Sequence, residues 1–89
     1  MLMFDEKNII SFREWMMQFI DQPNPYGDLA RDMKSDHDLP DSNKRYDIDR
    51  YLDLERSACE NALVTFQNAY NDYEFYVESI NLRNKLKNN

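Results

Sequence analysis

Residues 63–80 read LVTFQNAYNDYEFYVESI, and large apolar side chains recur along this segment in alternating steps of three and four. The recurring positions are Leu63, Phe66, Tyr70, Tyr73, Val77 and Ile80. This spacing places all of them on one face of an α-helix. At about 1.5 Å per residue the stripe is roughly 26 Å long, so it predicts a helix able to back several shorter ones. Ser57 and Glu60 have capping-box spacing and predict where this helix starts.

A shorter helix is predicted from Ser11. Ser11 and Glu14 have the spacing of a second capping box, and Ile10 and Trp15 match the hydrophobic staple that often flanks one. Its apolar face comprises Phe12, Trp15, Met16 and Phe19. Pro23 and Pro25 are expected to end this helix, because the residue before a proline is pushed out of the α region.

Two more helices are predicted between this one and the long helix. Asn24 is expected to cap a helix that has Pro25 at its first position and runs to about Ser35. Its predicted inward residues are Tyr26, Leu29, Ala30 and Met33. Residues 35–44 are polar and read as a connection with Leu39 turned inward. Asp47 is expected to cap a short helix through Glu55, and its predicted apolar face comprises Ile48, Tyr51 and Leu52.

The composition favours a single all-α domain. The chain has 89 residues, of which 42% are hydrophobic, and it contains one Gly and three Pro, which suits helices with short connections. We therefore predict a compact four-helix bundle with a long C-terminal helix. Residues 1–10 are interpreted as a lead-in, residues 11–80 as the helical domain, and residues 81–89 as a basic tail that frays.

Several observations favour a cytoplasmic protein. The single cysteine, Cys59, has no internal disulfide partner, which suits a reducing compartment. The segment MLMFDEKN (1–8) lacks the basic region and cleavage site of a signal peptide. No apolar stretch approaches the roughly 18 to 20 residues that span a bilayer. A membrane partner is therefore not expected.

The order of the landmark residues resembles that of the YozE SAM-like family of small all-helical bacterial proteins. The matching positions are Phe12, Trp15, Met16, Leu29, Ala30, Asp36, His37, Leu39, Pro40, Tyr46, Ile48, Tyr51, Leu52, Asp53, Phe66, Ala69, Tyr70 and Tyr73. Leu39 stands where the family favours Phe, and Tyr70 where it favours Trp. The resemblance implies a fold comparable to the sterile alpha motif. It implies no catalytic site, and the role of the family is unassigned.

No group of residues has the pattern of a catalytic or metal site. In the acidic cluster of Asp36, His37, Asp38 and Asp41, Pro40 interrupts the series of oxygen ligands and the glycine of a calcium loop is missing. Cys59 and His37 are the only conceivable thiol–imidazole pair, and a zinc site needs more ligands than one of each. We expect no enzyme activity, no cofactor and no bound metal, with Asp36 and Asp38 capping or solvating a turn and Cys59 half-buried.

Two binding hypotheses remain, and the first is a protein-interaction module. Residues 1–80 hold all 17 acids and eight of the 11 bases, an acidic body that repels phosphate backbones. The candidate partner surface comprises Asp47, Asp49, Asp53, Glu55 and Phe75. The alternative is a nucleic-acid-binding domain that uses Arg31, Lys34, Lys44, Arg45 and Arg50 with the tail residues Arg83, Lys85 and Lys87.

The apolar stripe of the long helix also has coiled-coil spacing. Packing of this stripe inside the bundle explains the same pattern, and we favour that interpretation. A monomer or a weak homo-oligomer is expected.

Overall fold

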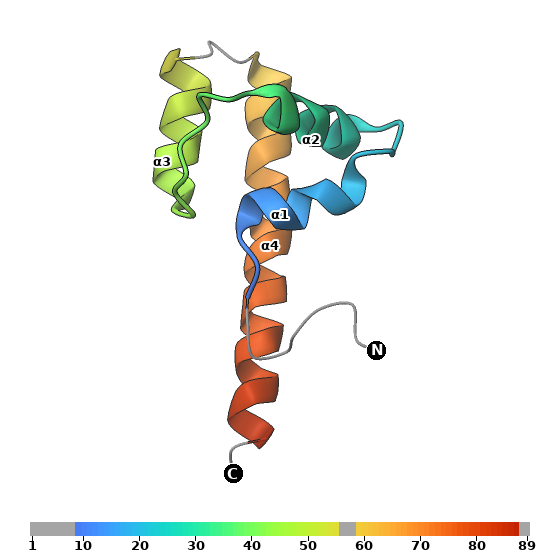
Figure 1. Cartoon of the computed structure of the whole chain (residues 1–89), viewed down its shortest axis with the longest axis vertical. Coiled ribbons are helices and arrows are strands. Elements are labelled where there is room, and N and C mark those ends of the chain that lie inside the picture. Colours follow the sequence, from blue (N-terminus) through green and yellow to red (C-terminus); the bar gives the residue numbers. More distant parts are fainter. Residues whose placement is uncertain (1–8, 56–58, 88–89) are drawn as a thin grey trace.

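The computed structural model describes residues 9–55 and 59–87, and its regular elements are all helical. They are α1 (Phe12–Met16), a 3₁₀ turn η1 (Met17–Phe19), α2 (Pro25–Ser35), α3 (Arg45–Arg50), a π-helical segment η2 (Tyr51–Glu55) and α4 (Glu60–Lys87). In Figure 1, α4 forms the long axis of the molecule, α1 and α2 cross its upper half, and α3 lies beside it. This arrangement, in the described part of the chain, confirms the predicted four-helix all-α fold with a long last helix.

The predicted caps of α1 and α2 are present. The Ser11 hydroxyl accepts a hydrogen bond from the backbone N–H of Glu14 at 3.1 Å. The Asn24 side-chain oxygen accepts from the backbone N–H of Gly27 at 3.0 Å, and Pro25 stands at the start of α2. The capping box predicted at Ser57 lies outside the described residues, as do the first eight residues of the predicted lead-in.

Three boundaries differ from the sequence prediction. The α-helical part of the first helix ends at Met16, well before Pro23, because the chain tightens into η1 and then turns back toward α2. α3 begins at Arg45, so Asp47 lies in its first turn and is not the cap; it accepts a hydrogen bond from the Ser42 hydroxyl at 2.6 Å. α4 continues to Lys87, through the part of the tail that was predicted to fray.

The core is built from aromatic rings contributed by α1 and α4. Phe12 is fully buried, and its ring contacts those of Trp15, Phe66, Tyr70 and Tyr73 at centroid separations of 5.0 to 6.0 Å. The predicted stripe of α4 faces inward. Its buried members are Phe66, Tyr70, Tyr73 and Ile80, with Leu63 and Val77 half-buried. From the other helices and the connection, Leu29, Ala30, Met33, Leu39, Ile48 and Leu52 are buried as predicted.

A hydrogen-bond network fastens the start of α1 to α4. The Tyr73 hydroxyl donates to the carbonyl of Ile10 at 2.8 Å and accepts from the side-chain amide of Asn43 at 2.8 Å. The Asn43 side-chain oxygen accepts from the backbone N–H of Phe12 at 2.6 Å, and the Tyr70 hydroxyl donates to the Asn43 carbonyl at 2.7 Å. One asparagine in an irregular connection therefore joins three segments that are distant in sequence.

Arg13 terminates α2 from outside that helix. Its guanidinium donates to the carbonyls of Met33 at 3.1 Å and Asp36 at 2.9 Å. The last carbonyls of a helix have no partner within the helix, and a cation is favoured beside them by the helix dipole. Arg13 thus fixes the position of α1 relative to the end of α2.

Candidate functional site

The predicted acidic surface divides into separate places on the molecule. Asp49 and Asp53 lie together on the outer side of α3 and η2. Asp47 is half-buried and hydrogen-bonded to Ser42. Phe75 lies on α4, in a different shallow hollow shared with Asn71, Glu74 and Glu78. The side chain of Glu55 lies outside the described residues. Of the four predicted surface residues whose side chains are described, the structure thus brings together only Asp49 and Asp53.

Those two acids flank apolar side chains that the sequence prediction did not include. Tyr46 is 67% exposed and Leu54 is 61% exposed. Together with Asp49, Arg50 and Asp53 they line a shallow surface hollow, which we call the α3–η2 face. The five residues recur at helical spacing on the side opposite Ile48 and Leu52. That spacing could have identified Tyr46 and Leu54 from the sequence as members of the same exposed side.

Polar contacts through Arg45 and the half-buried Asp49, at the edge of the α3–η2 face, anchor α3 to α4. The side-chain amide of Gln67 donates to Asp49 at 3.0 Å and its side-chain oxygen accepts from Arg45 at 2.8 Å. Arg45 also pairs with Glu74 at 3.0 Å and lies over the Tyr70 ring, 5.4 Å from the ring centroid. These contacts hold the short α3 helix in place, so the α3–η2 face is presented on a fixed backbone.

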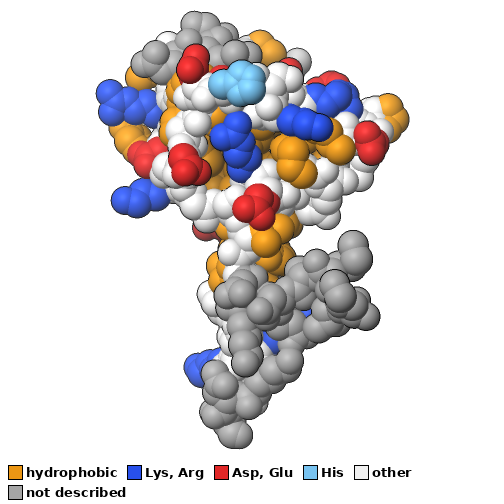
Figure 2. Space-filling model, in the orientation of Figure 1, with side chains coloured by type: hydrophobic (Ala, Val, Ile, Leu, Met, Phe, Trp, Pro, Cys, Tyr) orange, Lys and Arg blue, Asp and Glu red, His pale blue; other side chains and the backbone are white. Residues whose placement is uncertain are grey.

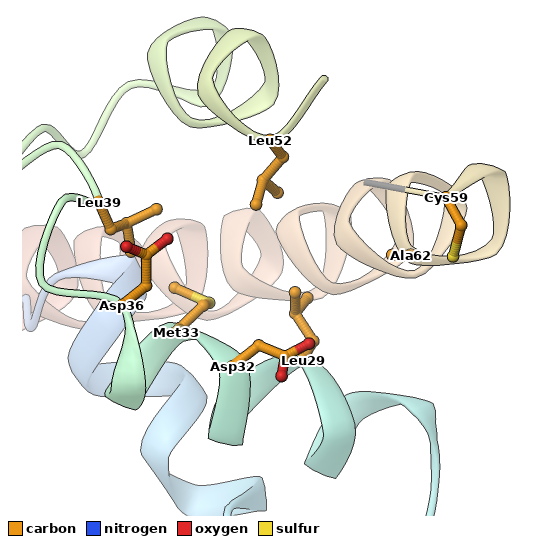
Figure 3. Close-up of a pocket in the computed structure, with 8 residues that line it drawn as sticks. All are labelled: Leu29, Asp32, Met33, Asp36, Leu39, Leu52, Cys59 and Ala62. Carbon is orange, nitrogen blue, oxygen red and sulfur yellow. The ribbon is translucent and has the colours of Figure 1, made fainter. Parts of the chain in front are cut away.

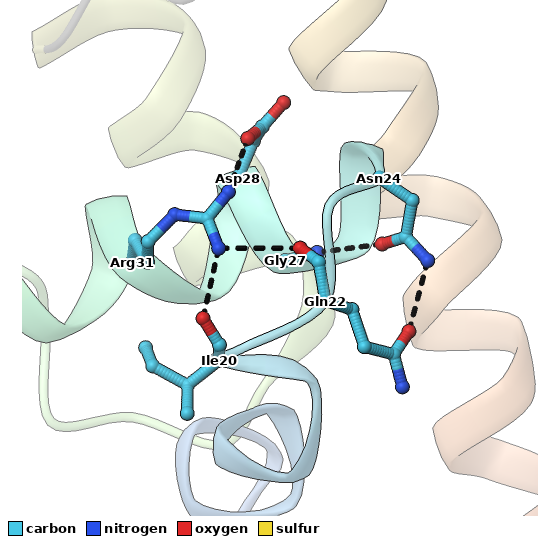
Figure 4. Close-up of polar contacts among 6 residues, drawn as sticks. All are labelled: Ile20, Gln22, Asn24, Gly27, Asp28 and Arg31. Carbon is cyan, nitrogen blue, oxygen red and sulfur yellow. Dashed lines mark hydrogen bonds and ion pairs between the residues drawn. The ribbon is translucent and has the colours of Figure 1, made fainter.

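Arg31, from the alternative nucleic-acid set, is engaged in a structural contact. Its guanidinium donates to the carbonyls of Ile20 at 2.8 Å and Gln22 at 3.2 Å and pairs with Asp28 (Figure 4). The same turn is closed by Gly27, where an added Cβ would lie 1.9 Å from the Gln22 carbonyl oxygen. Arg31 therefore holds the turn between η1 and α2.

The remaining basic residues do not gather into one patch. Arg50 lies between the acids of the α3–η2 face, while Lys34 and Lys44 are exposed on separate segments. Figure 2 shows Lys and Arg side chains interleaved with Asp and Glu over the bundle. In the tail, Arg83 and Lys85 are exposed on α4, and the side chain of Lys87 lies outside the described residues. A phosphate backbone favours a continuous basic surface, and on the side of the molecule shown in Figure 2 the basic side chains of the described residues are mixed with acidic ones.

A small cavity lies between α2, η2 and the start of α4 (Figure 3). Its apolar walls are formed by Leu29, Met33, Leu39, Leu52 and Ala62, and its polar residues are Asp32, Asp36 and Cys59. The Asp36 carboxylate accepts from the Tyr51 hydroxyl at 2.8 and 3.0 Å and from the backbone N–H of Asp38 at 3.0 Å. Asp36 thus caps the turn through the N–H of Asp38, as predicted, but its carboxylate is buried and bound to Tyr51 of η2 and is not solvated.

The other residues of the acidic cluster do not line this cavity. His37, Asp38 and Asp41 are exposed, and His37 does not line the cavity that contains Cys59. Cys59 itself is exposed, which corrects the predicted half-buried position. Within residues 9–55 and 59–87, no group of three or more His, Cys, Asp or Glu side chains is arranged to hold a metal ion.

Three phenols that join the helices have raised pKa values. Burial, followed by the hydrogen bond to Asp72 and the charge of that carboxylate, raises the pKa of Tyr26 to about 12. The Tyr26 hydroxyl donates to Asp72 at 2.7 Å and so links α2 to α4. Burial is also the main cause that raises the pKa values of Tyr70 and Tyr73. These groups are structural, because their hydroxyls hydrogen-bond distant parts of the bundle, namely Asp72, Asn43 and Ile10.

In the described part of the chain, no helix combines the length and apolar character needed to cross a membrane. A family model described as "YozE SAM-like fold" matches residues 11–75, which is most of the chain. Neither a curated protein nor a solved structure matches the chain. The matched range begins at the cap of α1 and ends at Phe75 on α4, so it includes the whole α3–η2 face.

Proposed function

The chain belongs to the YozE SAM-like family, and we propose that it is a non-catalytic helical module that binds another protein through the α3–η2 face. One observation carries the proposal: two large apolar side chains, Tyr46 and Leu54, are well exposed on a fixed backbone and are bordered by Asp49 and Asp53. Exposed apolar groups with a polar rim are typical of protein interfaces.

The charge of the face specifies the kind of partner. Asp49 and Asp53 outnumber Arg50, and the body of the protein is acidic. A partner with a hydrophobic patch surrounded by Lys or Arg side chains complements this face. Such electrostatic complementarity raises the rate of association. The non-catalytic part of the proposal is supported by the engagement of the buried Asp36 carboxylate with Tyr51 and by the absence of His37 from the cavity lining.

Site-specific photo-crosslinking in cells tests the proposal. A photoreactive residue replaces Leu54 in one variant and Val64 in the control, since Val64 is also exposed but lies on α4 in a different hollow, which it lines with residues of α2. A protein captured at position 54, and not at position 64, is the expected result. Asp53→Lys added to the position-54 variant should reduce that capture. Equal capture at both positions, or no effect of Asp53→Lys, would remove the α3–η2 face from consideration.

The nucleic-acid alternative has its own test. Titration with duplex and single-stranded DNA at low salt is expected to show no binding, because Arg31 and Arg45 are occupied and Arg50 lies among acids. Salt-sensitive binding that is lost with Lys34→Glu and Lys44→Glu would contradict the proposed function.

A further inference from the structure

A second apolar stripe runs along the outer side of α4. Phe75 is 70% exposed, Leu82 is 58% exposed and Leu86 is 64% exposed. With Ser79 between them, these positions follow one another in steps of four, three and four, which is the spacing of a coiled-coil seam. At 3.6 residues per turn they lie on the side of the helix opposite the inward stripe of Tyr73, Val77 and Ile80. We call this set the outer stripe.

The outer stripe occupies the part of α4 that extends past the other helices. Figure 1 shows that α1, α2 and α3 surround the upper half of α4 and that its C-terminal half projects beyond them. The molecule is 46 Å long but only 26 by 21 Å across, which reflects this projection. In the described part of the chain, no other helix therefore covers the stripe.

The charges along α4 specify which helix fits. Its first 21 residues contain the acids Glu60, Asp72, Glu74 and Glu78 and no base. Its last seven contain Arg83, Lys85 and Lys87 and no acid. A second copy of α4 laid antiparallel places the basic end of each helix against the acidic part of the other, whereas a parallel copy places the two basic ends side by side.

The antiparallel register follows from the seam. When Ser79 faces Leu82 of the second copy, Phe75 faces Leu86, and both contacts occur twice because the arrangement is two-fold symmetric. In this register the exposed Glu78 flanks the seam beside the exposed Lys85 of the second copy. We propose that the protein forms a weak antiparallel homodimer through the outer stripe of α4, a surface separate from the α3–η2 face.

The dimer is expected to be weak and concentration-dependent. Only about three helical turns contribute on each side. The surface area buried in the dimer should therefore be smaller than the roughly 1,200 to 2,000 Å² of a stable interface. Sedimentation velocity of the full chain over a wide range of concentrations should therefore show a reversible monomer–dimer equilibrium. A wild-type protein that is monomeric throughout would overturn the proposal and leave the stripe to a different protein or to residues 1–8.

Matched variants separate the outer stripe from the rest of the surface. Leu82→Asp should weaken dimerisation by at least ~10-fold, because each copy loses an apolar contact and gains a charge at the seam. The control is Val64→Asp, which introduces the same charge at an exposed apolar position near the other end of α4 and should leave dimerisation unchanged. Equal effects of the two variants would exclude the outer stripe.

Charge exchange tests the orientation. Glu78→Lys and Lys85→Glu should each weaken the dimer, and the double variant should restore it, because Lys at position 78 then meets Glu at position 85 of the second copy. In a parallel dimer, position 78 would instead flank Arg83 of the second copy. The double variant would then stay weakened, because the new Lys at position 78 would meet Arg83. Failure of the double variant to recover would therefore overturn the antiparallel arrangement.

Discussion

Replacement of Tyr73 by Phe removes one hydroxyl and leaves the packing of the ring in place. The ring remains against Phe12 and Trp15, whose centroids lie 5.5 and 5.7 Å away. The lost hydroxyl donates to the Ile10 carbonyl and accepts from the Asn43 amide, each at 2.8 Å. Because Tyr73 is almost fully buried, water does not easily replace it in these two bonds.

The expected loss in the free energy of unfolding is about 2 kcal/mol, at about 1 kcal/mol for each hydrogen bond. For a domain of this size each kcal/mol lowers Tm by about 4 to 8 °C, so Tm should fall by about 8 to 16 °C. Such a change is a large share of the roughly 5 to 15 kcal/mol that stabilises a small domain. The segment before α1 should loosen first, since the bond to Ile10 is one of its links to α4.

Urea unfolding followed by fluorescence measures this loss directly. Trp15 is the only tryptophan and is buried in the core, so its emission reports the packing of α1. Tyr46→Phe is the matched control, because it deletes the same atom from an exposed tyrosine. Asn43→Ala, alone and combined with Tyr73→Phe, completes a double-mutant cycle whose coupling energy should be about 1 kcal/mol.

If Tyr73→Phe and Tyr46→Phe unfolded at the same urea concentration with the same slope, the two hydrogen bonds of the Tyr73 hydroxyl would contribute nothing to stability. A cycle with no coupling between positions 43 and 73 would show that the Asn43–Tyr73 bond contributes nothing to stability, even if Tyr73→Phe is destabilising.

Two further predictions concern the links to α2. Gly27→Ala should lower the free energy of unfolding by about 1 to 3 kcal/mol, although alanine favours helices, because its Cβ would lie 1.9 Å from the Gln22 carbonyl oxygen; thermal unfolding measures this, and a more stable variant would contradict the close approach. The free energy of unfolding should fall as the pH rises from 10 through about 12. The pKa of Tyr26 is raised from 10.0 to about 12 in the folded protein, so the stability that its protonated phenol contributes is complete only below pH 10. Tyr26→Phe should reduce that alkaline loss in urea unfolding across this pH range, and an unchanged profile would assign the loss to other groups.

The sequence alone determined the elements whose signals are local. The caps at Ser11 and Asn24 act on backbone groups three positions away, and the stripe of α4 repeats within a single helix. These patterns depend only on the geometry of one helix, so the four helices, their inward faces and the core could be predicted. Asp49, Asp53 and Phe75 were also identified from the sequence as candidate surface residues.

The tertiary structure decided which of these residues lie together. The path of the connection placed Asn43 between α1 and α4 and turned the Asp36 carboxylate toward Tyr51, and neither contact has a local signal. Packing also assigned Arg13 and Arg31 to carbonyls of other segments, where a sequence shows only a positive charge.

The same holds for the two candidate surfaces. Asp53 and Phe75 both look exposed and functional in the sequence, yet they lie in separate hollows because α3 and α4 present different sides to solvent. A helical pattern fixes which residues share one side of a helix, but only the crossing of helices fixes which sides remain uncovered.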